Sequence, residues 1–355
     1  GTSNSTVGWS RPGQPALLAL EGDKVTLPSG VFFNAEDEAT YYGRAALDGY
    51  LAGYEGRLMR SLKSLLGTSL IDGQTEVEGR ILPFRALLTS FIGEIKRRAE
   101  RAAGREFERA VLGRPVFFVD GDPAADRKAQ DTLEQIAASV GLREVAFQYE
   151  PIAAAFDYES RLAREELVLI ADIGGGTSDF SLVRLSPENA GKSDRRGDIL
   201  ATGGVHIGGT DFDKYLSLAC VMPMLGLGGR LKNGSEVPSS HYFNLATWHT
   251  INLLYTQKVW TQLQDVQRDA CERDKLTLLL NLVRDRAGHW LAHKVEQTKI
   301  ALSDAELVPL ALERLDPAQA LPIGRAGSEP AIVHLAESVE RTVAGMLGDA
   351  GIAPS

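Results

Sequence analysis

Two kinds of hydrophobic spacing alternate along the chain, and each predicts a different element. Apolar residues three or four apart predict helices over 84–109, 126–140, 151–162 and 331–347, and an almost wholly helical stretch over 244–303. Short apolar or alternating runs beside turn residues predict strands within 7–20 and over 25–33, 111–119, 145–149, 198–202, 307–312 and 321–323. The region 45–66 has an irregular helical pattern, Thr210 is a candidate helix cap, and 225–238 is a glycine-rich loop.

The stretch 167–185, with the sequence LVLIADIGGGTSDFSLVRL, is the most informative. A continuous apolar run, a triple glycine and an alternating run predict two strands joined by a tight turn, with the first strand buried. Gly203 and Gly204 predict another turn. Strands followed by helices in the outer thirds of the chain, with helical insertions between them, predict an α/β protein with two major sheets and inserted subdomains.

Size, charge and cysteine usage narrow the class of protein. The 355 residues suffice for roughly two to three folding units. A formal net charge of −9 argues against nucleic acid as the main partner, because a phosphate backbone attracts a positive surface. Cys220 and Cys271 lack metal-site spacing, so we expect reduced thiols in a cytoplasmic protein. No apolar run reaches the roughly 18 residues of a membrane span, and residues 1–6 do not resemble a signal peptide.

The segment 172–179 carries the strongest chemical signal. Its glycines at 174–176 leave backbone amides open to an anion, and Thr177 adds a hydroxyl donor. A carboxylate at the end of a buried strand needs a reason to be there. Asp172 would have one in holding the water shell of Mg²⁺, with Asp179 supporting the same ion through water. A glycine-rich hairpin with two surface aspartates is the alternative.

The N-terminal residues 1–6, Gly-Thr-Ser-Asn-Ser-Thr, have related chemistry and suggest a second phosphate loop facing the first; a polar terminus is the alternative. Other nucleotide and metal motifs are excluded. No Gly-Lys-Ser/Thr follows the glycines at 174–176, as a Walker A loop requires, and a strand rather than a helix follows them, unlike a Rossmann fingerprint. His289 and His293 share a helix face but have no third ligand, so we expect no metal there.

Four motifs, in order along nearly the whole chain, resemble the signatures of DnaK-type heat-shock chaperone ATPase domains. They are Gly-Thr-Ser-Asn-Ser at 1–5, Glu-Pro-Ile-Ala-Ala-Ala at 150–155, the hairpin at 172–179, and His-Ile-Gly-Gly-Thr-Asp-Phe-Asp at 206–213. Gly-Arg-Pro-Val at 113–116 is more similar to the divergent YegD-like branch. The resemblance implies the two-lobed actin-like ATPase fold, with duplicated ribonuclease H-like domains and inserted subdomains around a nucleotide cleft.

The resemblance also implies domain boundaries. Lobe I would comprise residues 1–163, with its core at 1–28 and 110–163 and an inserted subdomain at 29–109. Lobe II would comprise residues 164–355, with its core at 164–207 and 327–355 and an inserted helical subdomain at 208–326.

The implied ligands are ATP or ADP with Mg²⁺. On the phosphate side, the resemblance implies contacts from Gly1, Thr2, Ser3, Asn4, Gly174, Gly175, Gly176 and Thr177. Thr2 and Ser3 would contact the β-phosphate, and Thr177 the region of the γ-phosphate. Asp172 would position metal-bound water and help orient the attacking water, and Asp179 would hold the hydrated ion from a second side.

Catalysis, by the same resemblance, would rest on Lys63, Glu150, Asp172 and Thr177. Lys63 matches a lysine that reaches the γ-phosphate and the attacking water, where a point charge offsets developing phosphoryl charge. An ordinary surface lysine on a helix is the alternative. Glu150 matches a carboxylate that orders cleft water and couples nucleotide state to lobe movement. The alternative is a glutamate that the dipole favours at a helix N-terminus.

Further contacts to the nucleotide are implied outside the hairpin. Gly208 and Gly209 match a turn that passes the nucleotide near the lobe junction. Glu296, Lys299 and Ser303 lie at i, i+3 and i+7, on one face of a predicted helix that in the family holds ribose and base. An ordinary polar helix face is the alternative.

The chain departs from the family pattern at several points. The aspartate that precedes the first Gly-Thr in the family is absent, because the chain starts at Gly1. Ile300 takes the place of an arginine that stacks on adenine, and Thr210 the place of a glutamate. The Gly-Gly-Ser loop that contacts adenosine in the family is not found before Ser355.

The favoured function is that of the nucleotide domain of a DnaK-like chaperone. It would bind ATP, hydrolyse it slowly, and use Mg-ATP in the interlobe cleft to control lobe closure. Two alternatives stay open: a nucleotide-responsive binding module with little hydrolysis, suggested by Ile300, and a small-molecule kinase on the same fold. Unfolded clients or co-chaperones would bind through regions that this chain does not contain, and neither nucleic acid nor membrane is expected as a partner.

Overall fold

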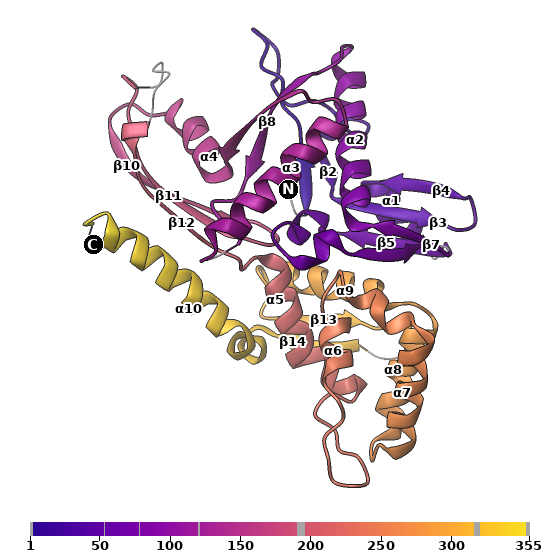
Figure 1. Ribbon diagram of the computed structural model, residues 1–355. Coiled ribbons are helices and arrows are strands. Elements are labelled where there is room, and N and C mark those ends of the chain that lie inside the picture. The colour runs from indigo at the N-terminus through magenta and orange to yellow at the C-terminus, as the bar shows by residue number, and fades with distance from the viewer. Residues whose placement is uncertain are drawn as a thin grey trace. The chain divides into compact units, whose positions relative to one another are not determined.

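The computed structural model describes residues 3–52, 54–77, 79–119, 121–189, 196–315 and 320–352. The chain divides into two compact units, Gly1–Gly209 with Ser338–Ser355, and Thr210–Glu337 (Figure 1). The mixed α/β class is confirmed, but the described strands form six small sheets of two or three strands instead of two major ones. The duplicated lobes and their boundaries stay a prediction. None of the described helices is both long and apolar enough to span a bilayer.

The N-terminal part of the first unit is built from short antiparallel strands and two helices. The strands are β1 (Asn4–Thr6), β2 (Thr26–Pro28), β3 (Gly30–Asn34), β4 (Ala39–Tyr42), β5 (Gly56–Arg60), β6 (Gln74–Val77) and β7 (Arg80–Pro83). β1 pairs with β2, β3 lies between β4 and β5, and β6 pairs with β7. The helices α1 (Arg44–Ala52) and α2 (Phe84–Ala103) accompany these sheets, and a buried core that includes Leu27, Leu65 and Phe91 joins β2, the following turns and α2.

Three predicted elements of this part differ from the structure in their bounds or their type. The helix predicted over 84–109 ends at Gly104, whose left-handed backbone (φ of 67°) closes the last turn on the carbonyl of Glu100. The region 45–66 is not one irregular helix, because β5 follows α1. In place of regular strands within 7–20, Gly8 and Leu17 form an isolated bridge.

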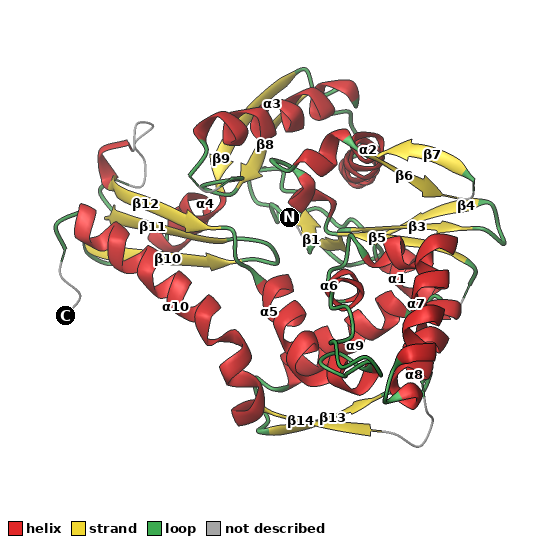
Figure 2. Ribbon diagram, turned by 60° about the horizontal axis from the view of Figure 1, so that its bottom comes forward, coloured by secondary structure: helices red, strands yellow, loops and turns green. Residues whose placement is uncertain are grey.

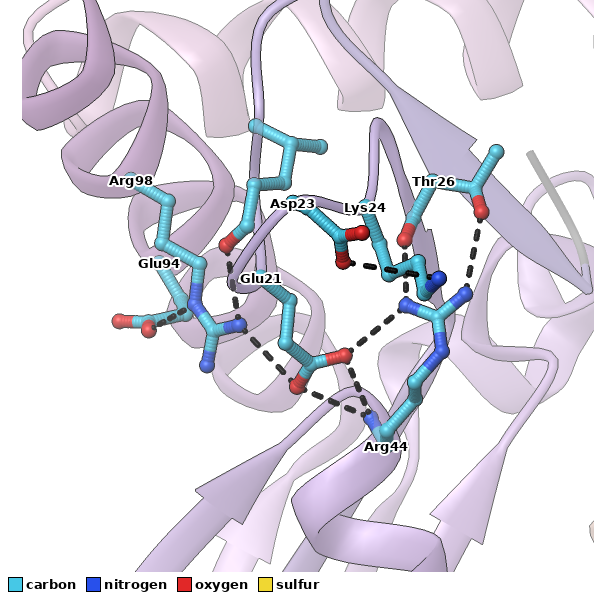
Figure 3. A network of polar contacts seen from close by, with 8 residues as sticks. Glu21, Asp23, Lys24, Thr26, Arg44, Glu94 and Arg98 are labelled. Carbon is cyan, nitrogen blue, oxygen red and sulfur yellow. Dashed lines mark hydrogen bonds and ion pairs between the residues drawn. The ribbon is translucent and has the colours of Figure 1, made fainter.

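A polar network fastens the segment before β2 to both helices (Figure 3). The Glu21 carboxylate accepts from the Arg44 side chain at 3.0 Å and from Arg98 at 3.3 Å. Arg98 also donates to the buried Glu94, and Arg44 to the carbonyl of Thr26. Two arginines from different helices thus share one carboxylate, which holds the segment before β2 against α1 and α2.

The remainder of the first unit carries the motifs at 150–155 and 172–179. Its elements are β8 (Arg109–Arg114), α3 (Pro123–Ser139), β9 (Glu144–Tyr149), α4 (Glu150–Glu159), β10 (Glu166–Ile173), β11 (Ser178–Leu185) and β12 (Ile199–Val205). β8 and β9 are parallel and joined through α3, whose N-cap Asp122 accepts from the amides of Ala124 and Ala125. The predicted buried strand over 111–119 instead ends at Arg114, and Val111 is 68% exposed.

Strands β10, β11 and β12 form an antiparallel sheet with a helix on each face (Figure 2). On one face Val183 and Leu185 pack with Ala155 of α4. On the other, Phe180 and Leu182 pack with Met346 of α10 (Arg325–Asp349). Two predictions fail here: β10 is only half-buried, with every second side chain exposed, and the turn predicted at 203–204 lies inside β12.

The second unit is mostly helical, as predicted for 244–303. Its elements are α5 (Gly209–Leu216), α6 (Ser240–Leu245), α7 (Gln257–Asp269), α8 (Arg273–Arg284), α9 (Gly288–Ala301), β13 (Leu307–Ala311), β14 (Ala320–Gly324) and the start of α10. β13 and β14 pair as a hairpin. Thr210 lies in the first turn of α5 instead of capping it, and α10 starts six residues before the predicted 331, at Arg325. Cys220 and Cys271 are free thiols.

Candidate functional site

The glycine loop between β10 and β11 is held between two other segments of the first unit. The amide of Gly174 donates to the carbonyl of Thr177 at 2.9 Å and closes the turn. On one side, a Cβ atom at Gly175 would overlap the side chain of Ser3. On the other, a Cβ at Gly208 would lie 2.5 Å from backbone atoms of Gly175 and Gly176. Glycine at 208 is therefore required by close backbone approach, and glycine at 175 leaves room for the Ser3 side chain. A loop that presents its amides to an anion needs such small residues.

The structure brings several predicted phosphate residues together in this way. Ser3 lies against the loop, and the amide of Gly209 donates to the carbonyl of Gly174 at 2.9 Å. Ser178 ties the same region down, because its Oγ donates to the carbonyl of Ile207 at 2.8 Å. Asn4 starts β1 with an exposed side chain. The predicted contacts of Gly1 and Thr2 lie outside the described residues.

Lys63 and Glu150 form a close ion pair. Lys63 lies in the short 3₁₀ turn η1 (Leu62–Leu65), and its Nζ is 2.6 Å from Oε1 of Glu150, the first residue of α4. The Lys63 side chain is only 15% exposed, so the alternative of an ordinary surface lysine does not hold. Burial opposes ionisation of Glu150, but the charge and hydrogen bond of Lys63 outweigh it and lower the pKa of Glu150.

Asp172 lies at the end of β10, opposite Asp179 of β11. Its side chain is half-buried. Burial, followed by the negative charge of Glu150, raises the pKa of Asp172, while the charge of Lys63 opposes the rise. A partly desolvated carboxylate beside a second carboxylate is an environment that a cation would stabilise.

Asp179 is the most buried carboxylate of the motif, with 2% of the residue exposed. Its Oδ1 accepts from the amide of Val116 at 2.5 Å, and Thr177 also hydrogen-bonds to it. Burial raises the pKa of Asp179 to about 6, with contributions from the charges of Glu150 and Asp172, while the two hydrogen bonds act in the opposite direction. The alternative of a surface aspartate is thus wrong for Asp179.

These carboxylates suit a metal ion that is bound together with a phosphate group better than one that is bound by protein side chains only. Among the described residues, no three His, Cys, Asp or Glu side chains gather where they could hold a metal. Glu150 is engaged by Lys63, and Asp179 by Val116 and Thr177. Asp172 would be the carboxylate available to a hydrated Mg²⁺, an ion that usually keeps several waters and takes one or two carboxylates together with phosphate oxygens.

The predicted adenosine residues lie in the second unit. Glu296 hydrogen-bonds to His293 at 3.2 Å, and Lys299 forms an ion pair with the buried Asp213 at 2.9 Å. Ser303 is not on the helix face expected for it, because α9 ends at Ala301 and Ser303 lies in the turn that follows. Ile300 is 60% exposed, an apolar surface where the family has an arginine.

Sequence reasoning missed two backbone groups, one at the end of β8 and one just after it. The carbonyl of Gly113 lies 3.5 Å from Nζ of Lys63, and the amide of Val116 binds Asp179. Neither contact has a sequence signal, because backbone groups supply both. Arg114 between them was noted only as part of a motif, although a charged residue inside an apolar run is a signal for a buried ion pair.

The raised pKa of Asp179 predicts a specific pH dependence of stability. A carboxyl whose pKa is raised by folding contributes stability below its unfolded value near 3.8 and loses it as pH rises through about 6. Asp179→Asn keeps an acceptor for Val116 but does not ionise. We expect its free energy of unfolding, relative to that of the native chain, to increase by about 1–3 kcal/mol from pH 4 to pH 7. Urea unfolding of both proteins at the two pH values measures this, and a stability difference that does not vary with pH would contradict it.

Comparison with known proteins supports the motif-based resemblance. The family model described as Hsp70 protein matches residues 85–222, a range that includes Glu150, the glycine loop and Gly208. The chain is 31% identical over 251 residues to a protein named Chaperone protein HscA homolog from Pseudoalteromonas atlantica, which covers 65% of this chain and 38% of that protein. It is 30% identical over 220 residues to Chaperone protein DnaK from Thermotoga petrophila, which covers 61% and 34%.

The chain spans little more than a third of the length of these relatives. Another protein named Chaperone protein HscA homolog, from Pseudomonas aeruginosa, is 32% identical over 261 residues, which is 66% of this chain and 38% of that protein. None of these matches bears on the YegD-like branch, which stays a prediction. Over these ranges the chain is thus similar to Hsp70 chaperones of the DnaK and HscA types.

Proposed function

We propose that this chain is the nucleotide-binding part of an Hsp70-type chaperone, and that it binds ATP with Mg²⁺ and hydrolyses it slowly. The observation that carries the proposal is the glycine loop 174–176, packed between Ser3 and Gly208 with the Lys63–Glu150 pair and Asp172 in the same unit. Such a loop offers amides to phosphate oxygens, and the carboxylates and the lysine are the groups that phosphoryl transfer uses.

Each side chain has a role that follows from its chemistry. Thr177 and the amides of 174–176 would bind phosphate oxygens. Lys63 would place its ammonium near the γ-phosphate, where positive charge stabilises the transition state more than the ground state. Asp172 would accept a hydrogen bond from the attacking water and hold it in line. Bound Mg²⁺ would neutralise charge on the β- and γ-phosphates.

Glu150 would act on Lys63. Its carboxylate lies 2.6 Å from the ammonium and keeps it at one end of α4. A γ-phosphate would compete with Glu150 for the same ammonium, because both are anions. Exchange of Lys63 between the two would make the start of α4 sensitive to nucleotide state, and we propose this as the source of nucleotide-controlled lobe closure.

The adenosine side rests on the resemblance alone. We assign it to Glu296, Lys299 and Ser303 as a proposal, together with Gly208 and Gly209 on the path of the nucleotide. We propose unfolded clients or co-chaperones as further partners, since the relatives carry chaperone names. The kinase and the hydrolysis-free module are not favoured, since the relatives carry chaperone names.

Calorimetric titration of the full-length protein with Mg-ATP and Mg-ADP tests the proposal. We expect both to bind, and phosphate release from Mg-ATP to vanish in Asp172→Asn. A phosphorylated small-molecule product would favour a kinase instead. Tight ATP binding without turnover would leave only a nucleotide-responsive module, and no binding of either nucleotide would overturn the proposal.

A further inference from the structure

Arg114, the last residue of β8, is a buried cation with no assigned role. Only 6% of the residue is exposed. Burying a guanidinium costs several kcal/mol in effect unless its charge and donors are all matched, so its surroundings should explain its presence. An apolar residue at the end of this strand would fill the space without that cost.

Each of the three guanidinium nitrogens donates a hydrogen bond. Nη2 donates to both carboxylate oxygens of Asp126 in α3, at 2.9 and 2.8 Å, and to the carbonyl of Val116 at 3.1 Å. Nη1 donates to Gln130 at 2.5 Å, and Nε to the carbonyl of Pro115 at 3.0 Å. The group also lies over the rings of Phe118 and Tyr149, 4.9 and 5.3 Å from their centroids.

These contacts fix the backbone of residues 115–118. Two of the carbonyls that Arg114 binds belong to this segment. Asp126, held by Arg114, accepts from the amide of Phe118 at 2.6 Å. The segment lies beyond the end of β8, so the strand ladder does not hold it, and the Arg114–Asp126 pair takes over that role.

The backbone on both sides of Arg114 touches the candidate site. After it, the amide of Val116 donates to Asp179 at 2.5 Å. Before it, the carbonyl of Gly113 lies 3.5 Å from Nζ of Lys63, and a Cβ at Gly113 would lie 3.0 Å from Glu150. Arg114 also pairs in register with Tyr149, the residue before Glu150.

We propose that Arg114 is a positioning residue for phosphoryl transfer. Through residues 113–118 it sets the spacing between the Lys63–Glu150 pair and the Asp179 end of the glycine hairpin, without touching the nucleotide. This inference rests on the proposed ATPase function. Because Lys63 and the attacking water act on the γ-phosphate, Arg114 affects turnover much more than the binding of Mg-ADP.

The test compares Arg114→Met, which keeps the aliphatic volume, with the native protein. We expect kcat for Mg-ATP to fall at least tenfold while Kd for Mg-ADP changes less than twofold. Amide exchange at Val116 and Phe118 becomes at least tenfold faster. Arg143→Met is the matched control, because that side chain is 76% exposed and pairs with Glu108 on the surface; its kcat stays within twofold of the native value.

A second variant keeps the test decisive if Arg114→Met does not fold. Asp126→Asn preserves shape but removes the anion that Arg114 binds, and we expect the same split between kcat and Mg-ADP binding. Native kcat in the variants, or equal losses of kcat and Mg-ADP affinity, overturns the positioning role while the ATPase function stands. Failure of the native protein to bind nucleotide is a separate outcome, which overturns the ATPase function and this inference together.

Discussion

Lys63→Met is expected to lower the turnover of Mg-ATP by at least about 100-fold, the loss typical of removing one group that stabilises the transition state. The ammonium lies 2.6 Å from Glu150 in a setting where the lysine side chain is 15% exposed, so water screens its charge poorly. Methionine keeps most of the stem and removes only the charge. Single-turnover phosphate release with saturating Mg-ATP measures the effect on chemistry apart from binding.

The same substitution has a second consequence, because Glu150 loses its counter-charge. Lys63 is what lowers the pKa of Glu150 against the effect of burial, so that pKa rises in Lys63→Met. The stability that the depressed pKa contributes above the unfolded value near 4.5 is then lost at neutral pH, and about 1–2 kcal/mol is expected for this partly exposed pair.

The double variant Lys63→Met with Glu150→Gln separates the two effects. Removing both charges leaves no unpaired group, so the free energy of unfolding should return close to the native value. Turnover should stay low, because the ammonium is still missing. Recovery of turnover in the double variant would show that Lys63 serves only to neutralise Glu150.

The spacing of apolar and glycine residues predicted elements whose formation depends mainly on neighbouring residues in the sequence. The hairpin at 167–185 followed from an apolar run, three glycines and an alternating run, and β10 and β11 agree with it. The same logic failed at Gly203 and Gly204, which resemble a turn but lie inside β12. A Cβ at Gly204 would lie 3.0 Å from the Asp179 carboxylate, so this residue is small for a reason of space that only the tertiary structure reveals. At Gly203 a Cβ would meet Met346 of α10 at 3.4 Å, which is an ordinary contact.

The sequence allowed the residues of the candidate site to be named, but not the contacts between them. The motifs identified Ser3, Gly175 and Gly208 as candidates. Their packing could not be predicted, because Gly175 lies about 170 residues from Ser3 and about 30 from Gly208 in the sequence. The roles of Gly113 and Val116 are carried by backbone atoms, which leave no trace in residue type. The half-buried state of β10 was missed because an apolar run does not reveal which neighbours will cover it.

Gly208→Ala is expected to reduce affinity for Mg-ADP at least tenfold and to lower the free energy of unfolding by about 1–3 kcal/mol, as overpacking does. The added methyl would lie 2.5 Å from Gly175 and Gly176, and both contacts are to backbone. No rotamer change can relieve them, so the glycine loop itself must move. Its amides then no longer converge where phosphate oxygens would lie, and calorimetry with Mg-ADP measures the loss.

Gly197→Ala and Gly175→Ala are the variants with which Gly208→Ala is compared. A Cβ at Gly197 meets nothing within 4 Å, so that variant should bind Mg-ADP as the native protein does. At Gly175 the obstacle is the Ser3 side chain, and adding Ser3→Ala should restore part of the loss. The expected order of damage is therefore Gly208, then Gly175, then Gly197. Equal affinities across the three variants would mean that the loop yields freely, and a loop that yields freely could not hold its amides in place for a phosphate.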